Sequence, residues 1–94
     1  MSAVTRLGDI CTGHGCWPPR EAVEASSNVF VNGIGVHRKG DGWNIHCCNN
    51  DCHFGTMVGG SDTVFINGRS AARIGDEINC GSLSAQGSSD TFFG

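Results

Sequence analysis

Histidine and cysteine are the residues of this chain whose types and spacing could do chemistry. The 94 residues contain 4 His and 6 Cys, and both side chains are preferred zinc ligands. Structural zinc takes four nitrogen or sulfur ligands in a closed tetrahedron. The sequence assembles no specific set of nucleophile, base and orienting acid, so we expect a structural metal protein and not an enzyme. The candidate ligands are His14, His37, His46, His53, Cys11, Cys16, Cys47, Cys48, Cys52 and Cys80.

The spacing of three Gly-Asp pairs, at residues 8–9, 40–41 and 75–76, ranks these candidates. His14 and His46 each follow their pair by five residues, and Cys80 follows the third pair by four. His53 lies just before a segment that should begin the strand leading to the next copy. The sequence therefore predicts one closed site with no open position for a substrate. Its ligands are His14, His46, His53 and Cys80.

Other roles for the middle cysteines stay open at this point. Cys48 and Cys52 could replace His46 and His53 as ligands, or they could form a bridge. Cys47 is adjacent to Cys48, so at most one of them can easily face the same centre.

The remaining His and Cys have simpler expectations. Cys11 and Cys16 are close enough in sequence for a local disulfide, and His37 falls inside a predicted strand, where a structural role is expected. The N-terminus lacks the apolar segment of a signal peptide. We therefore expect folding in a reducing cytosol, where cysteines serve as metal ligands more often than as bridges.

Three imperfect copies of one motif must position these ligands. Residues 28–33 (NVFVNG) recur as residues 63–68 (TVFING), and a truncated copy occupies residues 90–94. Three copies in one chain predict a unit with threefold pseudo-symmetry. The β-branched and aromatic runs favour strands, and Asn32-Gly33 and Asn67-Gly68 predict type I′ hairpins.

The other segments are expected to be short strands, turns and loops. The second strands of the hairpins should cover residues 34–38 and 69–74. The Gly-Asp pairs predict turns in which the aspartates make Asx-type hydrogen bonds. Residues 21–25 could form one helical turn at most, and residues 42–55, with no apolar period, are expected to be a loop.

Length and charge exclude several classes of protein. We expect one domain over residues 1–94, small enough to need a metal, disulfides or a partner for stability. The net charge is −3 and the six basic residues are scattered, so the basic footprint of a nucleic-acid-binding protein is missing. No apolar run approaches the roughly 20 residues of a membrane-spanning helix.

Several ordered motifs resemble those of a PAAR-repeat domain. Residues 6–9 (RLGD), 12–15 (TGHG) and 27–33 (SNVFVNG) are similar to the opening of that family. Residues 61–76 resemble its central signature, with Ser70-Ala71-Ala72-Arg73 in place of Pro-Ala-Ala-Arg. Cys80-Gly81 and residues 88–94 are similar to its end, so the resemblance covers nearly the whole chain. The first copy of the signature, residues 35–38, keeps only the arginine.

The resemblance implies an all-β fold, a small cone of short hairpins with little or no helix. It also implies one structural metal ion, with zinc as the expected ion, on the three-His, one-Cys set named above. The flat base of such a cone sits on a trimeric β-helical spike, one chain per trimer. Family members cap the spikes of type VI secretion systems and contractile phage tails.

The expected function is therefore that of a membrane-piercing spike tip. The chain would be made in the bacterial cytoplasm and delivered outside the cell or into a target cell, touching its membrane transiently, with an effector as a further candidate partner. We expect no homo-oligomer and no effector extension. The alternatives are a free-standing zinc-binding interaction module and a disulfide-stapled secreted toxin or hydrolase. The residues expected to contact the spike are Val29, Phe30, Val64, Phe65, Phe92 and Phe93.

Overall fold

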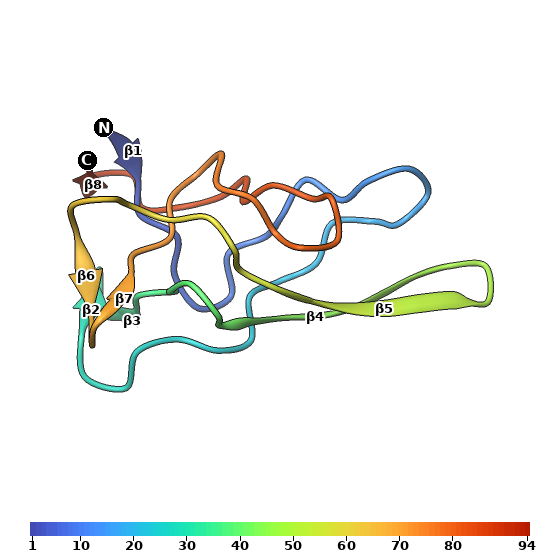
Figure 1. Ribbon diagram of the computed structural model, residues 1–94, viewed down its shortest axis with the longest axis horizontal. Coiled ribbons are helices and arrows are strands. Elements are labelled where there is room, and N and C mark those ends of the chain that lie inside the picture. Colours follow the sequence, from blue (N-terminus) through green and yellow to red (C-terminus); the bar gives the residue numbers. More distant parts are fainter.

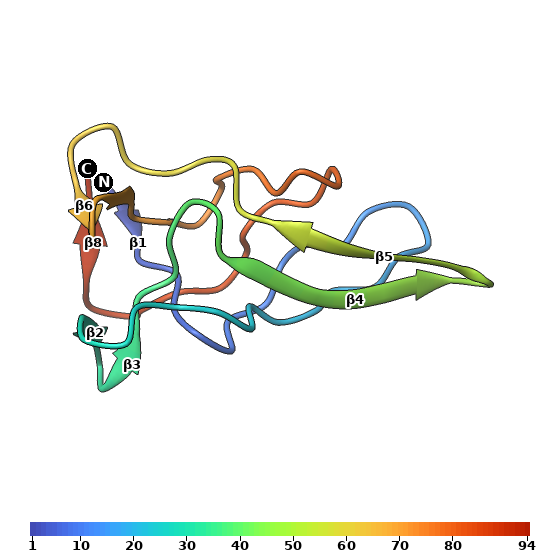
Figure 2. The same ribbon diagram turned by 60° about the horizontal axis from the view of Figure 1, so that its bottom comes forward.

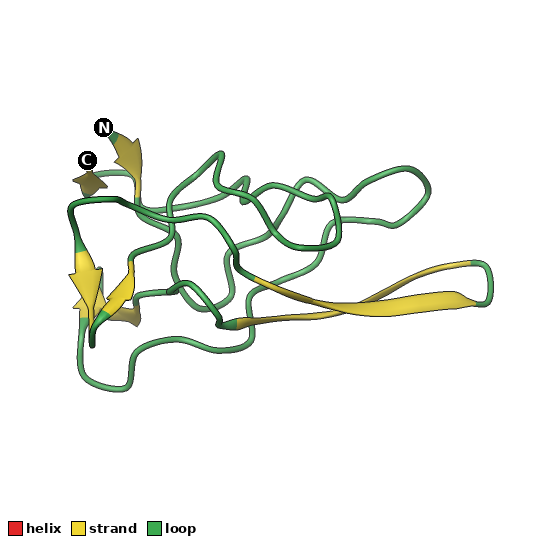
Figure 3. Cartoon of the chain, in the orientation of Figure 1, coloured by secondary structure: helices red, strands yellow, loops and turns green.

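The computed structural model describes residues 1–94 and contains only strands, turns and loops (Figure 3). This confirms the predicted all-β class, and no helical turn forms at residues 21–25. No helix is present that could cross a membrane. The strands are β1 (Ser2–Ala3), β2 (Phe30–Val31), β3 (Ile34–Gly35), β4 (Gly42–Cys48), β5 (Asp51–Thr56), β6 (Phe65–Ile66), β7 (Arg69–Ser70) and β8 (Phe92–Phe93).

The molecule is elongated, with extents of 37 × 23 × 21 Å. Three short antiparallel pairs, β1–β8, β2–β3 and β6–β7, gather at one end, which we call the base. The β4–β5 hairpin extends from the opposite end, so the molecule tapers away from the base (Figures 1 and 2).

Two of the three strand pairs at the base are the predicted type I′ hairpins. Asn32 and Gly33 have φ of 57° and 74°, and Asn67 and Gly68 have φ of 55° and 78°. Asparagine and glycine tolerate these left-handed values, which a type I′ turn requires at both central positions. The second strands are shorter than expected and end at Gly35 and Ser70, because the following residues turn inward to a central ring.

The third strand pair at the base is formed by the two ends of the chain. Strand β1 lies antiparallel to β8, with Ser2 opposite Phe93 and Ala3 opposite Phe92. Both termini therefore lie side by side at the base (Figure 1). Residues 3–6 take the place that residues 35–38 and 70–73 take in the other two copies. The sequence analysis found the truncated last copy but missed this partner.

A ring of backbone hydrogen bonds joins the three copies at the centre. Thr5 donates its N–H to the carbonyl of Ala72 at 3.0 Å, Ala72 donates to His37 at 2.9 Å, and His37 donates to Thr5 at 3.0 Å. None of the three residues is exposed to solvent. The closed ring satisfies buried backbone groups that would otherwise be costly, and it marks the pseudo-threefold axis.

Each copy continues from the ring into an Arg-x-Gly-Asp turn. The glycines at positions 8, 40 and 75 have φ between 87° and 92°. In every turn the aspartate accepts hydrogen bonds from the backbone N–H and the guanidinium of the arginine three residues earlier. The expected turns are present, but the carboxylates bond backwards to an arginine and do not form the forward Asx bond we expected.

The core consists of two small clusters along the axis. The base cluster contains Val4, Val31, Val36, Ile66 and Ala71, with Val29, Val64 and Phe93 packed against it. The second cluster surrounds the buried indole of Trp43 and includes Cys11, Ala22, Met57, Ala72 and Ile78, with Cys80 packed against it.

The expectation of a loop over residues 42–55 is wrong, since this segment forms the β4–β5 hairpin. His46 lies opposite His53 and Cys47 lies opposite Cys52 in its register. Asn49, with φ of 56°, occupies a left-handed position in its turn. The hairpin gave no apolar alternation because polar and sulfur-bearing residues occupy both faces, and a disulfide replaces part of the packing.

Candidate metal centre

The structure brings together all four residues predicted as ligands. His46 and His53 face each other across β4 and β5. His14 comes from the turn of residues 14–17, and Cys80 from a turn after Ile78. One nitrogen or sulfur atom from each residue lies within 4.8 Å of the others. These four residues form the candidate metal centre.

The donor atoms of the candidate metal centre lie close enough together to share one metal ion. The Nε2 atom of His53 lies 3.1 Å from Nε2 of His14 and 2.6 Å from Nε2 of His46. Nitrogens bound to one tetrahedral zinc at about 2.0–2.1 Å would be roughly 3.3 Å apart. A single proton can bridge only one pair of these nitrogens, whereas one cation satisfies all of them together with the sulfur. The residues present therefore fit a metal ion.

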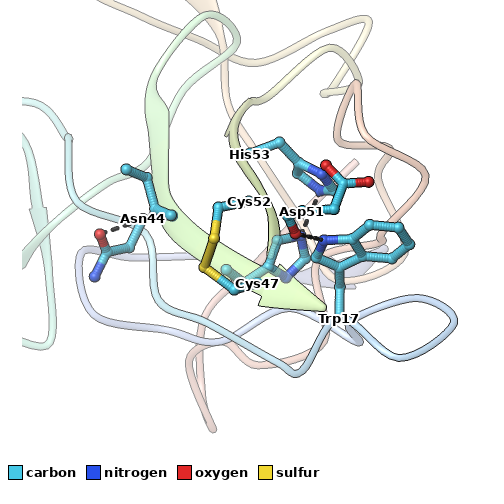
Figure 4. The surroundings of a disulfide bond; sticks show 8 residues. Trp17, Asn44, Cys47, Asp51, Cys52 and His53 are labelled. Atoms are coloured by element: carbon cyan, nitrogen blue, oxygen red, sulfur yellow. Dashed lines mark hydrogen bonds between the residues drawn. A yellow bond between two sulfur atoms is a disulfide. The ribbon is translucent and has the colours of Figure 1, made fainter. Parts of the chain in front are cut away.

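Neighbouring groups orient the imidazoles. Nδ1 of His46 lies 2.8 Å from the carbonyl oxygen of Pro18, a contact that places the proton on Nδ1 and leaves Nε2 free to bind metal. The ring of Trp17 stacks on His14, with centroids 4.9 Å apart. Its Nε1–H donates to the carbonyl of Asp51 at 2.8 Å, as the dashed line in Figure 4 shows. Trp17 thereby ties the His14 turn to the hairpin.

The local environment keeps these ligands ready to bind a cation. Burial lowers the pKa of His14, and the charges of His53 and Arg20 add to the effect. Burial also lowers the pKa of His46. For Cys80, burial raises the thiol pKa, but hydrogen bonds from Ser82 and Arg20 outweigh it and leave the pKa lowered. Neutral imidazoles and a thiolate are the forms that bind metal.

Four cysteines form disulfides beside the candidate metal centre, which corrects our expectation that they would be ligands more often than bridges. Cys47 pairs with Cys52 across the hairpin (Figure 4), and Cys16 pairs with Cys48. The alternatives of Cys48 or Cys52 as ligands, and of a Cys11–Cys16 bridge, are therefore wrong. Cys11 has a free, buried thiol.

Every bridge lies close in sequence to a histidine of the candidate metal centre. Cys16 is two residues from His14, Cys47 follows His46, and Cys52 precedes His53. The disulfides therefore restrain the backbone at all three imidazoles. Spacing alone could not have given this connectivity, because identical cysteines allow several pairings.

The residues predicted to contact a partner lie at the base in two groups. Phe30, Phe65 and Phe92 occupy equivalent positions in the three strand pairs at the base. They are 57%, 57% and 48% exposed. The other three, Val29, Val64 and Phe93, pack against the base cluster. The base thus presents three equivalent exposed phenylalanines on a thin apolar core.

Comparison with protein-family models shows which family this chain belongs to. Residues 12–83 match the family model described as the PAAR motif, which is well over half of the chain. The chain belongs to the PAAR-motif family. The name-giving segment of this PAAR chain, residues 70–73, places Ala71 and Ala72 in the core and directs Arg73 to Asp76.

Curated relatives of this PAAR chain are longer proteins. It is 35% identical over 78 residues to the "NAD(P)(+) glycohydrolase toxin Tse6" of Pseudomonas aeruginosa, and equally to the "(p)ppApp synthetase toxin Tas1" of that species. These alignments cover 77% of this chain but only 18% of each relative. It is also 59% identical over 34 residues to the "Double-stranded DNA deaminase toxin A" of Burkholderia cenocepacia, over 36% of this chain and 2% of the relative.

Proposed function

We propose that this PAAR chain is the tip of the spike of a contractile injection machine, in a type VI secretion system or a contractile phage tail. The role is structural and needs no catalytic group. The observation that carries it is the base, where a single chain presents three equivalent surfaces around one pseudo-threefold axis.

The base suits a partner with true threefold symmetry, such as a trimeric β-helical spike. One PAAR chain would cap one trimer, with Phe30, Phe65 and Phe92 each contacting one subunit. Burying exposed apolar surface contributes roughly 25 cal/mol per Å², and unpaired strand edges at the base can pair with the sheets of the spike. Val29, Val64 and Phe93 support this face from within.

We further propose that His14, His46, His53 and Cys80 hold one structural metal ion, with zinc as the expected ion. Soft and borderline donors in a closed set of four are the pattern of structural zinc. The tapered end has loops and a two-stranded hairpin in place of a large core, so a metal ion would provide much of its rigidity.

The same proposal includes where the protein acts. The chain would be made in the bacterial cytoplasm, assembled on the spike and delivered outside or into a target cell, with transient membrane contact at the tapered end. The toxin names of the relatives support a link to effector delivery, with residues 1–94 as the PAAR domain itself.

Co-expression with a trimeric β-helical spike, followed by native mass spectrometry and elemental analysis, tests the proposal. We expect one PAAR chain and one metal ion per spike trimer. The triple variant Phe30→Asp, Phe65→Asp, Phe92→Asp should lose the complex. Ile45→Asp is a matched control, because Ile45 is also 57% exposed but lies on β4, away from the base. Equal binding by the triple variant would overturn the proposed docking face.

A further inference from the structure

Arg20 is a buried cation beside the candidate metal centre, with only 5% of the residue exposed. Its guanidinium divides its donors among three acceptors. Nε donates to the carbonyl of Asn44 at 2.8 Å, one terminal nitrogen to Sγ of Cys11 at 3.1 Å, and the other to Sγ of Cys80 at 3.2 Å. The guanidinium carbon also lies 5.8 Å from the ring centroid of Trp43. Arg20 therefore connects Cys80 to the core.

No carboxylate balances the charge of Arg20. The ion pairs of the molecule use Arg6, Arg38, Arg69 and Arg73 with aspartates. A buried charge without a partner costs several kcal/mol. The acceptors of Arg20 are the carbonyl oxygen of Asn44 and the two sulfur atoms, and electron-rich sulfur compensates the charge better than a neutral thiol does.

The neighbouring strand leaves room for this guanidinium. A Cβ added to Gly55, on β5, would collide with the terminal nitrogen of Arg20 that contacts Cys80, and it would come within 3.0 Å of Ile78. Gly55 does not have a positive φ, so its lack of a side chain is explained by space. The glycine lies two residues after His53, and therefore places the guanidinium against the candidate metal centre.

We propose that Arg20 is a positioning residue of the metal centre that holds the sulfur of Cys80 in the fourth ligand position and disperses the negative charge of the metal-bound thiolate. Cys11 is the second anchor that fixes the guanidinium plane. The inference rests on the proposed metal site and adds the residue that positions its one sulfur ligand. Arginine suits this task because its rigid planar fork directs donors at two acceptors in fixed directions, whereas the donors of a lysine ammonium lie on a single flexible nitrogen.

Cobalt(II) provides the test, because a thiolate bound to cobalt absorbs in the near ultraviolet and reports the sulfur ligand directly. The wild-type chain, with disulfides intact, is loaded with cobalt, and its affinity is measured by competition with a chelator. In Arg20→Gln we expect affinity to fall about 10- to 100-fold, the usual cost of losing an outer-shell partner, with a shifted or weakened thiolate band. Arg20→Lys should be intermediate.

Gly55→Ala provides a second route to the same effect, because it displaces the guanidinium without changing any charge. We expect it to weaken the thiolate band as Arg20→Lys does. Arg69→Gln is the matched control, since Arg69 also hydrogen-bonds a backbone carbonyl but pairs with Asp41. Its affinity and spectrum should equal those of the wild type.

The outcomes separate this inference from the proposed function. A wild-type chain that binds no cobalt overturns the proposed metal site and this inference with it, but leaves the docking of the base on a spike to its own test. If folded Arg20→Gln and Arg20→Lys bind cobalt with the affinity and the thiolate band of the wild type, the positioning role alone is overturned. If neither Arg20 variant folds, Gly55→Ala decides, and a spectrum identical to the wild type overturns the role.

Discussion

Ser2 lies directly opposite Phe93 in an antiparallel pair, although 91 positions of sequence separate them. This pairing supplies the third hairpin of the base, which the other two copies build from a local Asn-Gly turn. The pseudo-threefold base is therefore complete only when the two ends of the chain meet, and its third part depends on long-range contacts.

The buried serines Ser26, Ser61 and Ser88 hydrogen-bond to neighbouring copies of the repeat, and their removal should destabilise the fold. The Oγ of Ser61 accepts the N–H groups of Thr63 and Val64 and donates to the carbonyl of Gly94. We expect Ser61→Ala to lower the free energy of unfolding by about 1–3 kcal/mol, since buried donors lose their acceptor. Urea unfolding measures this. Ser89→Ala, at an exposed serine, should change little, and similar losses in both variants would contradict the role of Ser61.

Removing a ligand of the candidate metal centre should strip the metal and loosen the tapered end. We expect His14→Ala and Cys80→Ala each to abolish metal binding and to lower the Tm by more than about 10 °C, because a structural metal ion would stabilise the folded state by several kcal/mol. Elemental analysis and thermal melting measure the two effects. His37→Gln alters a histidine outside the site and should keep the metal. Unchanged melting in both ligand variants would exclude a metal clamp.

Stability should fall in mild acid because of His37. Its ring is fully buried, Nδ1 lies 2.7 Å from the carbonyl of Glu24, and Nε2 has no partner. Burial lowers its pKa, outweighing the opposite effects of the Glu24 carbonyl and Asp41, while the Arg38 charge lowers it further.

The unfolded chain therefore binds more protons than the native chain below about pH 6.5, and the free energy of unfolding decreases as pH falls. The measurement is the difference in unfolding free energy between the wild type and His37→Gln at about pH 7.5 and about pH 5.5. The wild type should lose more, by at most roughly 1.4 kcal/mol per pH unit. An equal loss of unfolding free energy in the wild type and in His37→Gln would show that His37 contributes nothing to the pH dependence.

The Cys16–Cys48 bridge should matter more than the Cys47–Cys52 bridge. The first closes a sequence separation of 32 and the second one of 5. Chain entropy predicts a loss of roughly 3–4 kcal/mol for the first and about 2 kcal/mol for the second. Double Cys→Ser variants test this by thermal melting. Only the first should also weaken metal retention strongly, because it frees the turn of His14. Equal effects would argue against this distinction.

Much of the fold and the site follows from local sequence signals. Asn32-Gly33 and Asn67-Gly68 encode their own turns, and three of the four candidate ligands, His14, His46 and Cys80, have a regular relation to the Gly-Asp pairs, so both could be predicted. The third hairpin could not, because residues 3–6 share little with residues 70–73 and their partner strand is at the other end of the chain. The β4–β5 hairpin was missed because its strands carry ligands and disulfides where an apolar face would be.

The equivalence of Phe30, Phe65 and Phe92 has a consequence for any assembly with a trimer. A single chain could seat on a threefold partner in three rotational registers that differ little in energy, since each phenylalanine would meet an identical subunit. The β4–β5 hairpin, which is longer than the equivalent segments of residues 9–22 and 76–84 in the other copies, would then point in one of three directions from particle to particle. Reconstructions averaged with threefold symmetry would show the base clearly and blur the hairpin, and only images aligned without symmetry would recover it.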